Sequence, residues 1–272
     1  MGSEGGGASA ASAAAAAGGA GGSLIEFNIT GFKKFHGVAE NPTEIIVGRI
    51  EEYLRIHGMP AGTVLGSCTV LEAAGEGALL PLMQLLHSSS SSSSSSSQSL
   101  IKRRPWIDRH WIQRDANWQE GGDHHHLNTQ SASLPQKQIV WVHFGVNSAA
   151  TNFALEWCAV NEATFRCSDE LGWQPQRVPI VAEDGPISHI RETTIPVRDV
   201  VTVLRMNGYD VMESYDAGRF VCNYVYYQSL RHSAAYGNRS IFVHVPLFIM
   251  IDEEHQLQFV AALLHALAFR LL

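Results

Sequence analysis

Long apolar segments, cysteine pairs and an excess of positive charge are all missing from this sequence. No run of about eighteen apolar residues occurs, so no stretch is typical of a membrane-spanning helix. The net charge is −7, and acidic and basic residues are interspersed, so no basic face indicates nucleic-acid binding. We therefore expect the chain to bind neither membranes nor nucleic acids.

Cysteines are few and widely spaced. Cys68, Cys158, Cys167 and Cys222 lie in different segments without a CxxC pair. This spacing is typical of reduced thiols in a cytosolic protein, rather than of a disulfide scaffold or a zinc site. We expect no disulfide, no bound metal and a cytoplasmic (cytosolic) location.

Two tracts contain too few large apolar side chains to form a core. Residues 1–23 are almost all Gly, Ala and Ser, and the segment 88–135 begins with ten consecutive serines and stays polar. Such compositions are typical of disorder. We interpret residues 1–23 as a disordered tail and residues 88–135 as a surface insertion, both belonging to a chain with one domain, residues 24–272.

A run of three histidines, at positions 124–126, lies inside this insertion. Adjacent imidazoles can bind divalent ions. Gly121 and Gly122 disfavour a helix here, however, and consecutive histidines do not face one site. The run therefore does not change the expectation that no metal is bound.

Apolar periodicity predicts alternating strands and helices elsewhere in the chain. Strands are expected at residues 24–30, 64–71, 139–145 and 240–246, and helices at residues 43–58, 73–86, 197–206 and 252–271. The strand at 139–145 is apolar throughout, as expected of a parallel strand buried on both faces. This alternation favours a three-layer α/β/α fold with a mainly parallel twisted sheet, in which ligands bind at the carboxyl ends of the strands.

Residues 214–230 place a cysteine near the start of an expected helix. Ser214 and Asp216 are good N-cap residues, which puts Cys222 in the first two turns. The free amides and the helix dipole there favour a thiolate and lower the cysteine pKa. His244, in the apolar strand, is the candidate base. The alternative interpretation is that both Cys222 and His244 are buried core residues.

Three other residues stand out by their surroundings. Glu156 lies between apolar residues, where a carboxylate needs either a structural Arg or Lys partner or an imidazolium in a catalytic site. Phe32 and Phe35 lie on an otherwise polar loop that is expected to begin at Gly31. They either pack against the next helix or form a hydrophobic wall for a small ligand.

Several short motifs occur in a fixed order between Phe27 and about Leu271. They are Thr30-Gly31-Phe32, Phe35, Asn41-Pro42, Gly145, Glu156, Asn161, Asp184-Gly185-Pro186, Asp216-Ala217-Gly218-Arg219, Cys222-Asn223, Tyr226-Tyr227 and His244-Val245-Pro246. Together they make the chain resemble the pyroglutamyl peptidase type I (pyrrolidone-carboxylate peptidase) family of cysteine peptidases. It looks like a plant-type member.

This resemblance implies a cysteine omega-peptidase that hydrolyses the N-terminal pyroglutamyl (5-oxoproline) residue from peptides through a thioacyl-enzyme intermediate, without a cofactor. The family's nucleophile falls on Cys222, its histidine on His244 and its acidic residue on Glu156. His244 would take the thiol proton and later protonate the leaving amine, while Glu156 would orient the imidazole.

The resemblance also implies the residues that bind substrate. Phe32 and Phe35 match aromatic pocket residues of the family, and Asn41 matches a polar residue of the same loop. Arg166 matches an arginine of bacterial members and is expected to support either the oxyanion or the substrate. Lys34 departs from the family, because a proline usually stands between the two phenylalanines, and its presence predicts a looser loop.

Two rival functions are compatible with this fold class. The first is a catalytically inactive binding protein with the same fold, and the second is nucleoside phosphorolysis, which would need a glycine-rich phosphate loop that the sequence lacks. Pyroglutamyl peptides are the expected partners. Both a monomer and a homo-oligomer fit the resemblance, because bacterial relatives assemble and others need not. The insertion precedes the strand at 139–145 and is expected opposite the site.

Overall fold

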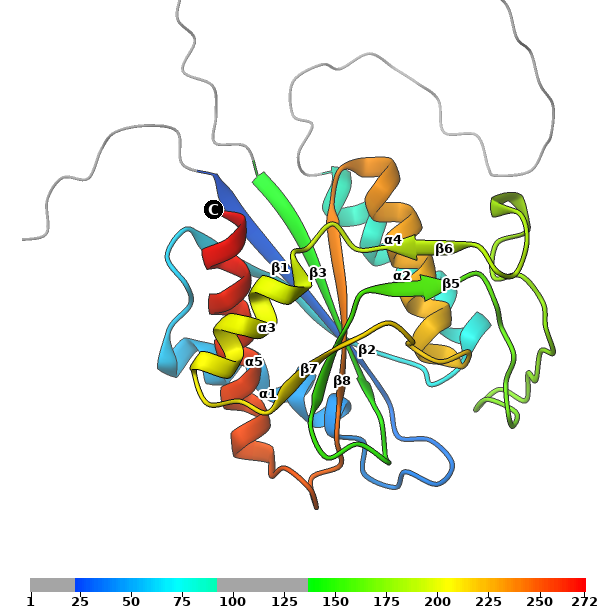
Figure 1. Ribbon diagram of the computed structural model, residues 1–272, viewed down its shortest axis with the longest axis horizontal. Coiled ribbons are helices and arrows are strands. Elements are labelled where there is room, and N and C mark those ends of the chain that lie inside the picture. Colours follow the sequence, from blue (N-terminus) through cyan, green and yellow to red (C-terminus); the bar gives the residue numbers. More distant parts are fainter. Residues whose placement is uncertain (1–22, 92–136) are drawn as a thin grey trace, which may run out of the picture.

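A six-stranded sheet forms the centre of the protein in the computed structural model, which describes residues 23–91 and 137–272 (Figure 1). The strands are β1 (Leu24–Phe32), β2 (Thr63–Leu71), β3 (Lys137–Val146), β4 (Phe153–Glu156), β5 (Cys158–Val160), β6 (Ile190–Glu192), β7 (Val211–Ser214) and β8 (Arg239–Val245). The helices are α1 (Pro42–His57), α2 (Gly75–Ser91), α3 (Val197–Met206), α4 (Val221–Tyr236) and α5 (Glu253–Leu271), with a 3-10 turn, η1 (Ala182–Asp184). Most of both tracts predicted to be disordered lies outside the described residues.

The strand order in the main sheet is β2-β1-β3-β8-β4-β7. The first four of these strands are parallel, β4 runs antiparallel to β8, and β7 runs parallel to β4. The prediction of a mainly parallel sheet is therefore confirmed. The reversal at β4 was not predicted; it arises because only six residues, 147–152, connect β3 to β4, and parallel strands need a longer crossover. The four-residue strand β7 and the separate two-stranded antiparallel sheet of β5 and β6 were also not predicted.

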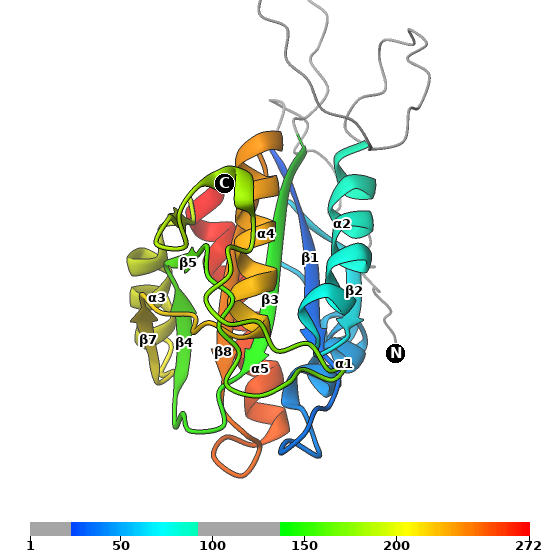
Figure 2. The ribbon, with the colours of Figure 1, turned by 90° about the vertical axis from the view of Figure 1, so that its right-hand side faces the viewer.

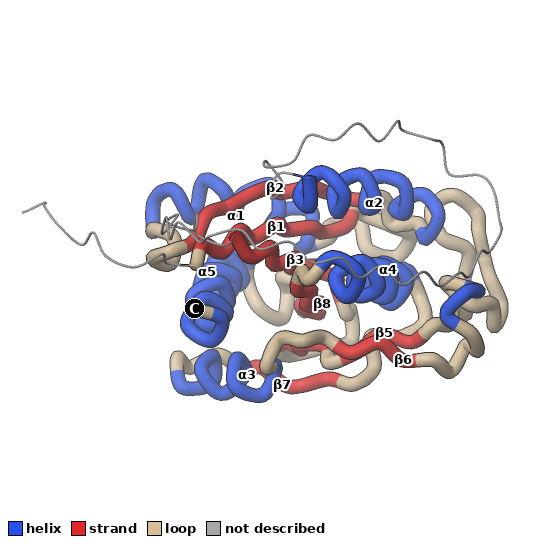
Figure 3. The backbone as a smooth tube through the Cα atoms, turned by 90° about the horizontal axis from the view of Figure 1, so that it is seen from above, coloured by secondary structure: helices blue, strands red, loops and turns tan. Residues whose placement is uncertain are grey.

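Helices cover both faces of the sheet, so that the fold has three layers (Figure 3). Helices α1, α3 and α5 pack on one face and share a core with alternate residues of β3, Val140, Val142 and Phe144. On the other face, α2 and α4 pack on Ile139 and Trp141 of the same strand. Strand β3 is thus buried on both sides, as its continuous apolar run predicted.

Local signals fix most helix ends. The Asn41 side chain accepts from the backbone N–H of Thr43 and Pro42 opens α1, which closes at Gly58. Helix α3 has the predicted bounds, and Asp252 caps α5. Helix α2 continues to Ser91, beyond the predicted end at residue 86.

Gly31 was expected to open a loop, and that expectation is wrong. The residue lies inside β1, where a Cβ atom would come within 2.5 Å of the Thr43 carbonyl oxygen and 2.9 Å of Val47. Glycine is needed because strand and helix approach each other closely here. The loop therefore begins only at Lys33.

The described residues that border the segment 92–136 are far from the carboxyl ends of the parallel strands. Lys137 is the first residue of β3, and Figure 2 shows β3 entering the sheet at the end of the molecule where α2 finishes. Strand β3 then runs its full length before reaching Val146 at the opposite edge. Within the described residues, none of the helices has the length and apolar character that crossing a bilayer requires.

Candidate active site

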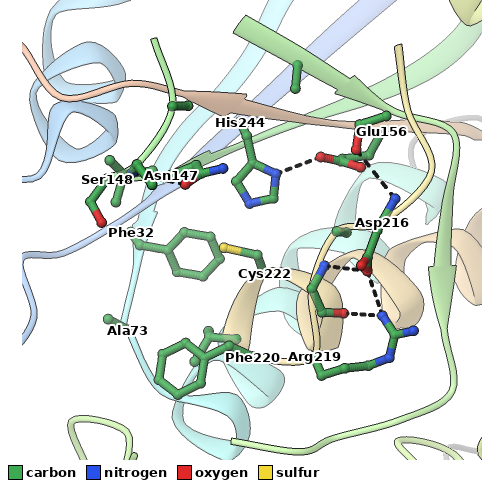
Figure 4. A pocket seen from close by; sticks show the side chains of 18 of the residues that line it. Phe32, Ala73, Asn147, Ser148, Glu156, Asp216, Arg219, Phe220, Cys222 and His244 are labelled. Carbon is green, nitrogen blue, oxygen red and sulfur yellow. Dashed lines mark hydrogen bonds and ion pairs between the residues drawn. The ribbon is translucent and has the colours of Figure 1, made fainter. Parts of the chain in front are cut away.

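Three side chains from different elements meet at one edge of the main sheet: Glu156, His244 and Cys222, hereafter the Cys–His–Glu triad (Figure 4). Cys222 is the second residue of α4, His244 lies near the end of β8, and Glu156 ends β4. The Nδ1 atom of His244 is 2.7 Å from Oε1 of Glu156. Figure 4 shows the cysteine side chain between the His244 imidazole and the Phe32 ring. The three side chains thus lie in the order that a nucleophile, a base and an orienting carboxylate would require.

Gly145 sets the position of the sulfur atom. It pairs with His244 across β3 and β8. A Cβ atom at Gly145 would lie 2.8 Å from Sγ of Cys222 and 2.7 Å from the Phe242 ring. The sulfur therefore lies over the backbone of β3, directly beside the strand that carries the imidazole, and only glycine leaves it room there.

His244 and Glu156 are shielded from water, whereas Cys222 is half-buried and lines a cavity. The exposed fraction is 8% for His244 and 1% for Glu156. Burial alone would lower the pKa of His244, but the hydrogen bond and charge of Cys222, followed by those of Glu156, outweigh burial and raise it to about 10. The imidazole is thus held in its protonated form, which favours an ion pair with the thiolate.

The carboxylate of Glu156 contacts the imidazole of His244 through one of its two oxygens. Its second oxygen, Oε2, is buried without a hydrogen-bond partner among the described residues, so the protonated His244 is its main source of stabilisation. The hydroxyl of Tyr226 donates to the backbone oxygen of Glu156 over 2.9 Å. This bond ties the end of β4 to α4, the helix that carries the cysteine.

The start of α4 differs from the prediction. Neither Ser214 nor Asp216 caps the helix; its N-cap is Phe220, without a side-chain hydrogen bond. Asp216 instead accepts from the Gly218 backbone and from Arg219, in a turn where Gly218 has φ 79°. The first N–H groups of α4, next to Cys222, are therefore left without a side-chain acceptor and form a site suited to a negatively charged oxygen.

A cavity of about 490 Å³ opens onto the triad. It lies at the carboxyl ends of β1, β3 and β8, as predicted for this fold class. Phe32 and Phe35 line it together with Ala73, Phe220 and Val221. This apolar wall supports the predicted ligand-facing role of the two phenylalanines; Phe32 also packs in the core, since its exposed fraction is 3%.

Asn41 also lines the cavity, but its polar atoms serve the loop itself. Its Oδ1 accepts from the backbone and the hydroxyl of Thr43, and its Nδ2 donates to the Lys33 carbonyl over 2.9 Å. The structure thus gives this side chain a positioning role, because it holds the Phe32–Phe35 segment on the start of α1.

Lys34 does not leave this loop loose, contrary to expectation. Its backbone N–H donates to Glu44 over 2.9 Å, a bond that a proline could not make. The next turn is held by the N–H of His36 on Glu170 and by a β-bridge between Phe35 and Val38. These bonds hold the aromatic wall in place.

Arg166 lies at the rim of the cavity with an exposed side chain. Within the described residues its guanidinium makes no hydrogen bond or ion pair, so it is available to a ligand. Sequence reasoning missed Phe220, Asn147, Ala154 and Met212, which also line the cavity. Phe220 had a usable signal, since it lies two residues before Cys222; the others depend on strand register.

His143 has a structural role. It is fully buried, and its ring nitrogens contact the hydroxyls of Thr30 at 2.7 Å and Ser229 at 2.8 Å. Burial lowers its pKa to about 3, so the ring is neutral. All four cysteines are free thiols, and no group of three His, Cys, Asp or Glu side chains suited to a metal occurs in the described parts of the chain.

Known proteins match the part of the chain that carries the triad. A sequence model of the family described as pyroglutamyl peptidase matches residues 125–258. The chain is 35% identical to a pyrrolidone-carboxylate peptidase of Thermococcus litoralis over 112 residues, 40% of this chain and 50% of the relative. It is 36% identical to one of Vibrio vulnificus over 118 residues, 43% and 54% of the two chains. The chain thus spans about half the length of the curated relatives it matches.

Solved structures share the fold over a longer range. A mutant pyrrolidone carboxyl peptidase of Pyrococcus furiosus has a TM-score of 0.64 at 21% identity, covering 91% of this chain and 100% of that one. The Thermococcus litoralis enzyme has a TM-score of 0.62 at 21% identity, covering 90% and 93%. At this identity the likeness concerns the fold. The match over residues 125–258 makes the chain similar to the pyroglutamyl peptidase family in the part that carries the triad.

Proposed function

We propose that the protein is a cysteine omega-peptidase that removes an N-terminal pyroglutamyl residue from peptides. The observation that carries this proposal is the Cys–His–Glu triad beside a cavity with an apolar wall, in which Nδ1 of the buried His244 lies 2.7 Å from Oε1 of the buried Glu156. Its relatives are named pyrrolidone-carboxylate peptidases. The proposal assigns catalytic roles to Glu156, His244 and Cys222.

Acylation begins with the thiolate of Cys222, whose proton resides on His244. The sulfur attacks the pyroglutamyl carbonyl carbon, and the oxygen, now negatively charged, is stabilised by the free N–H groups at the start of α4. As the carbon–nitrogen bond breaks, His244 donates its proton to the leaving amine. The products are a peptide with a free amino terminus and a pyroglutamyl thioester on Cys222.

Deacylation uses the same residues in reverse. His244, now neutral, takes a proton from a water molecule, whose oxygen attacks the thioester carbon. The carbon–sulfur bond breaks, leaving free pyroglutamate and the thiolate of Cys222 beside a protonated imidazole. Glu156 holds the imidazole in place through both halves and stabilises its charged form.

Substrate recognition follows from the chemistry of the lactam. A pyroglutamyl group has no free amine, so its site needs no carboxylate; it needs an apolar slot for a flat ring and partners for the lactam groups. Phe32 and Phe35 provide the apolar slot, Asn41 holds their loop, and Arg166 is the exposed donor at the rim. A neutral, flat acyl group fits this lining better than a charged amino acid.

The test is release of a fluorophore from a pyroglutamyl amide by the purified protein under reducing conditions. We expect turnover by the wild type and its loss in Cys222→Ala. The same fluorophore on an alanyl group, which carries a free amine, should not be released. A folded wild-type protein without turnover would favour the alternative, an inactive protein that binds pyroglutamyl peptides.

The broader setting is proposed on the same basis. One domain, residues 24–272 with an insertion at 88–135, carries the activity, and four free thiols agree with a reducing cytosol. A peptidase of this kind acts on short peptides whose first residue has cyclised.

A further inference from the structure

The cavity extends beyond the pyroglutamyl slot, and strand register divides it into two sides. On one side, Phe32 pairs with Leu71 of β2 and lies two residues beyond the Thr30–His143 pair of β1 and β3. On the other side, His244 pairs with Ala154 of β4. Ala154 in turn pairs with Met212 of β7. Paired residues point to the same face.

A row of side chains therefore crosses the sheet edge in the order Phe32, Gly145, His244, Ala154, Met212. The sulfur of Cys222 lies over Gly145, between Phe32 and His244. We call the Phe32 side of the sulfur the acyl side. The surface beyond His244, formed by Ala154, Met212 and residues 147–152, is the leaving-group side. Both sides belong to the same cavity.

The proposed reaction fixes what each side binds. The acyl carbon must bond to the sulfur, and the leaving nitrogen must lie within hydrogen-bond reach of His244, which protonates it. The pyroglutamyl ring then lies against Phe32, and the chain that follows it passes His244 in the opposite direction. We propose that Ala154 and Met212 form the binding site for the residue that follows the pyroglutamyl group, and that this site prefers an apolar side chain.

The leaving-group side combines an anchored loop with an exposed apolar side chain. The loop 147–152 is anchored, because the N–H of Asn147 donates to the Val245 carbonyl over 2.9 Å and that of Ala150 donates to Asn147 over 3.0 Å. The Met212 side chain is 42% exposed beside this loop. An apolar substrate side chain that covers Met212 removes apolar surface of both side chains from water, which favours binding.

Charge supports the preference. Arg219, one of two arginines that line the cavity, is already bonded to Asp216 and Glu162. The other, Arg166, follows Phe165, whose ring packs on Phe220 beside Cys222 with 4.5 Å between centroids. An acidic side chain at Ala154 and Met212 would find Arg219 already paired and would lose part of its hydration.

The experiment compares kcat/KM for three peptides, pyroglutamyl-X-amides in which X is Leu, Gly or Asp, and for pyroglutamamide, which has no following residue. The wild type should favour Leu over Asp by about tenfold. Met212→Ala should lower the Leu/Gly ratio by about three- to tenfold, as expected for losing part of one apolar contact. Met212→Lys should raise the Asp/Gly ratio by a similar factor. Met206→Ala, 82% exposed on α3, is the matched control and should change neither ratio.

This inference rests on the proposed function, and the two can fail separately. If the wild type cleaves pyroglutamamide and the peptides but both ratios stay constant in the Met212 variants, the leaving-group site is wrong and the peptidase stands. If no compound is cleaved, pyroglutamamide included, the proposed function itself is overturned.

Discussion

At the scale of single residues, the site depends on contacts between side chains from three elements, α4, β8 and β4. Cys222, His244 and Glu156 could each be singled out by setting or by family motif, but their contact could not, because it depends on how β4 and β8 pair. Asp216 looked like a helix cap and instead forms a turn with Arg219. The sequence thus indicated which residues carry reactive side chains. It did not indicate whether Asp216 would cap α4 or bond to Arg219.

Replacing Glu156 by Gln tests whether its charge supports the ion pair between His244 and Cys222. The amide keeps the size of the side chain but removes the charge that raises the pKa of His244. We expect kcat/KM on a pyroglutamyl amide to fall by about a hundredfold or more. Alkylation of Cys222 near pH 6, measured in a Cys167→Ser background to remove the exposed thiol, should slow in parallel. Unchanged alkylation would show that Glu156 does not support the ion pair.

The raised pKa of His244 also makes stability depend on pH. The folded pKa, about 10, exceeds the ordinary value of 6.5, so this residue stabilises the fold fully below about pH 6.5 and loses that contribution as pH rises through 10. Urea unfolding of the wild type and of His244→Gln should differ by about 2 kcal/mol more at pH 6 than at pH 10. A difference that grows with pH would contradict the protonated imidazole.

At the scale of elements, periodicity and capping residues predicted most of the fold. The capping pairs Asn41–Thr43 and Asp252–His255 begin α1 and α5 close to the expected first residues, 43 and 252. Strand β7 and the antiparallel direction of β4 were not predicted. Both strands have only four residues, which is too few to show a clear periodicity, and the direction of β4 depends on its pairing with the remote strand β8. Long periodic segments are therefore predictable, and short edge strands that complete a site are not.

Ser229 links the helix of the nucleophile to the strand of the base. Ser229 stands seven residues after Cys222 on α4, and its hydroxyl lies 2.8 Å from His143. The same hydroxyl lies 2.9 Å from that of Ser240, which stands four residues before His244 on β8. Ser229→Ala should leave buried partners unpaired and lower the free energy of unfolding by about 1–3 kcal/mol.

The same variant should also change the pH profile of Cys222 alkylation, because α4 can then shift against β8. Val200→Ala on α3 is the matched control: it empties space in the opposite core, costs a similar free energy, and should leave that profile unaltered. Equal profiles in both variants would mean that Ser229 contributes to stability alone.

At the scale of the whole molecule, the sheet separates the site from the border of the undescribed segment. Ser91 and Lys137 lie at the end of the molecule away from the cavity, which begins at Val146 on β3. The composition of residues 88–135 alone predicted an insertion. Because this segment precedes the parallel strand expected at 139–145, it was expected at the edge of the sheet opposite the site.

Replacing residues 92–136 by a flexible Gly/Ser linker of about ten residues should therefore leave kcat/KM on a pyroglutamyl amide within about twofold of the wild type, since loop length costs little stability. Thermal unfolding of the same variant serves as the folding control. A well-folded deletion variant with strongly reduced activity would show that the segment takes part in the reaction.

The central claim is that Cys222 carries the pyroglutamyl group during turnover. Rapid acid quenching of the protein with a pyroglutamyl substrate, followed by mass spectrometry of its peptides, tests this directly. We predict a mass increase of one pyroglutamyl group on the peptide that contains Cys222, appearing before the steady state and missing in Cys222→Ser. Turnover with an unmodified Cys222 peptide, or the same adduct on another residue, would contradict the account.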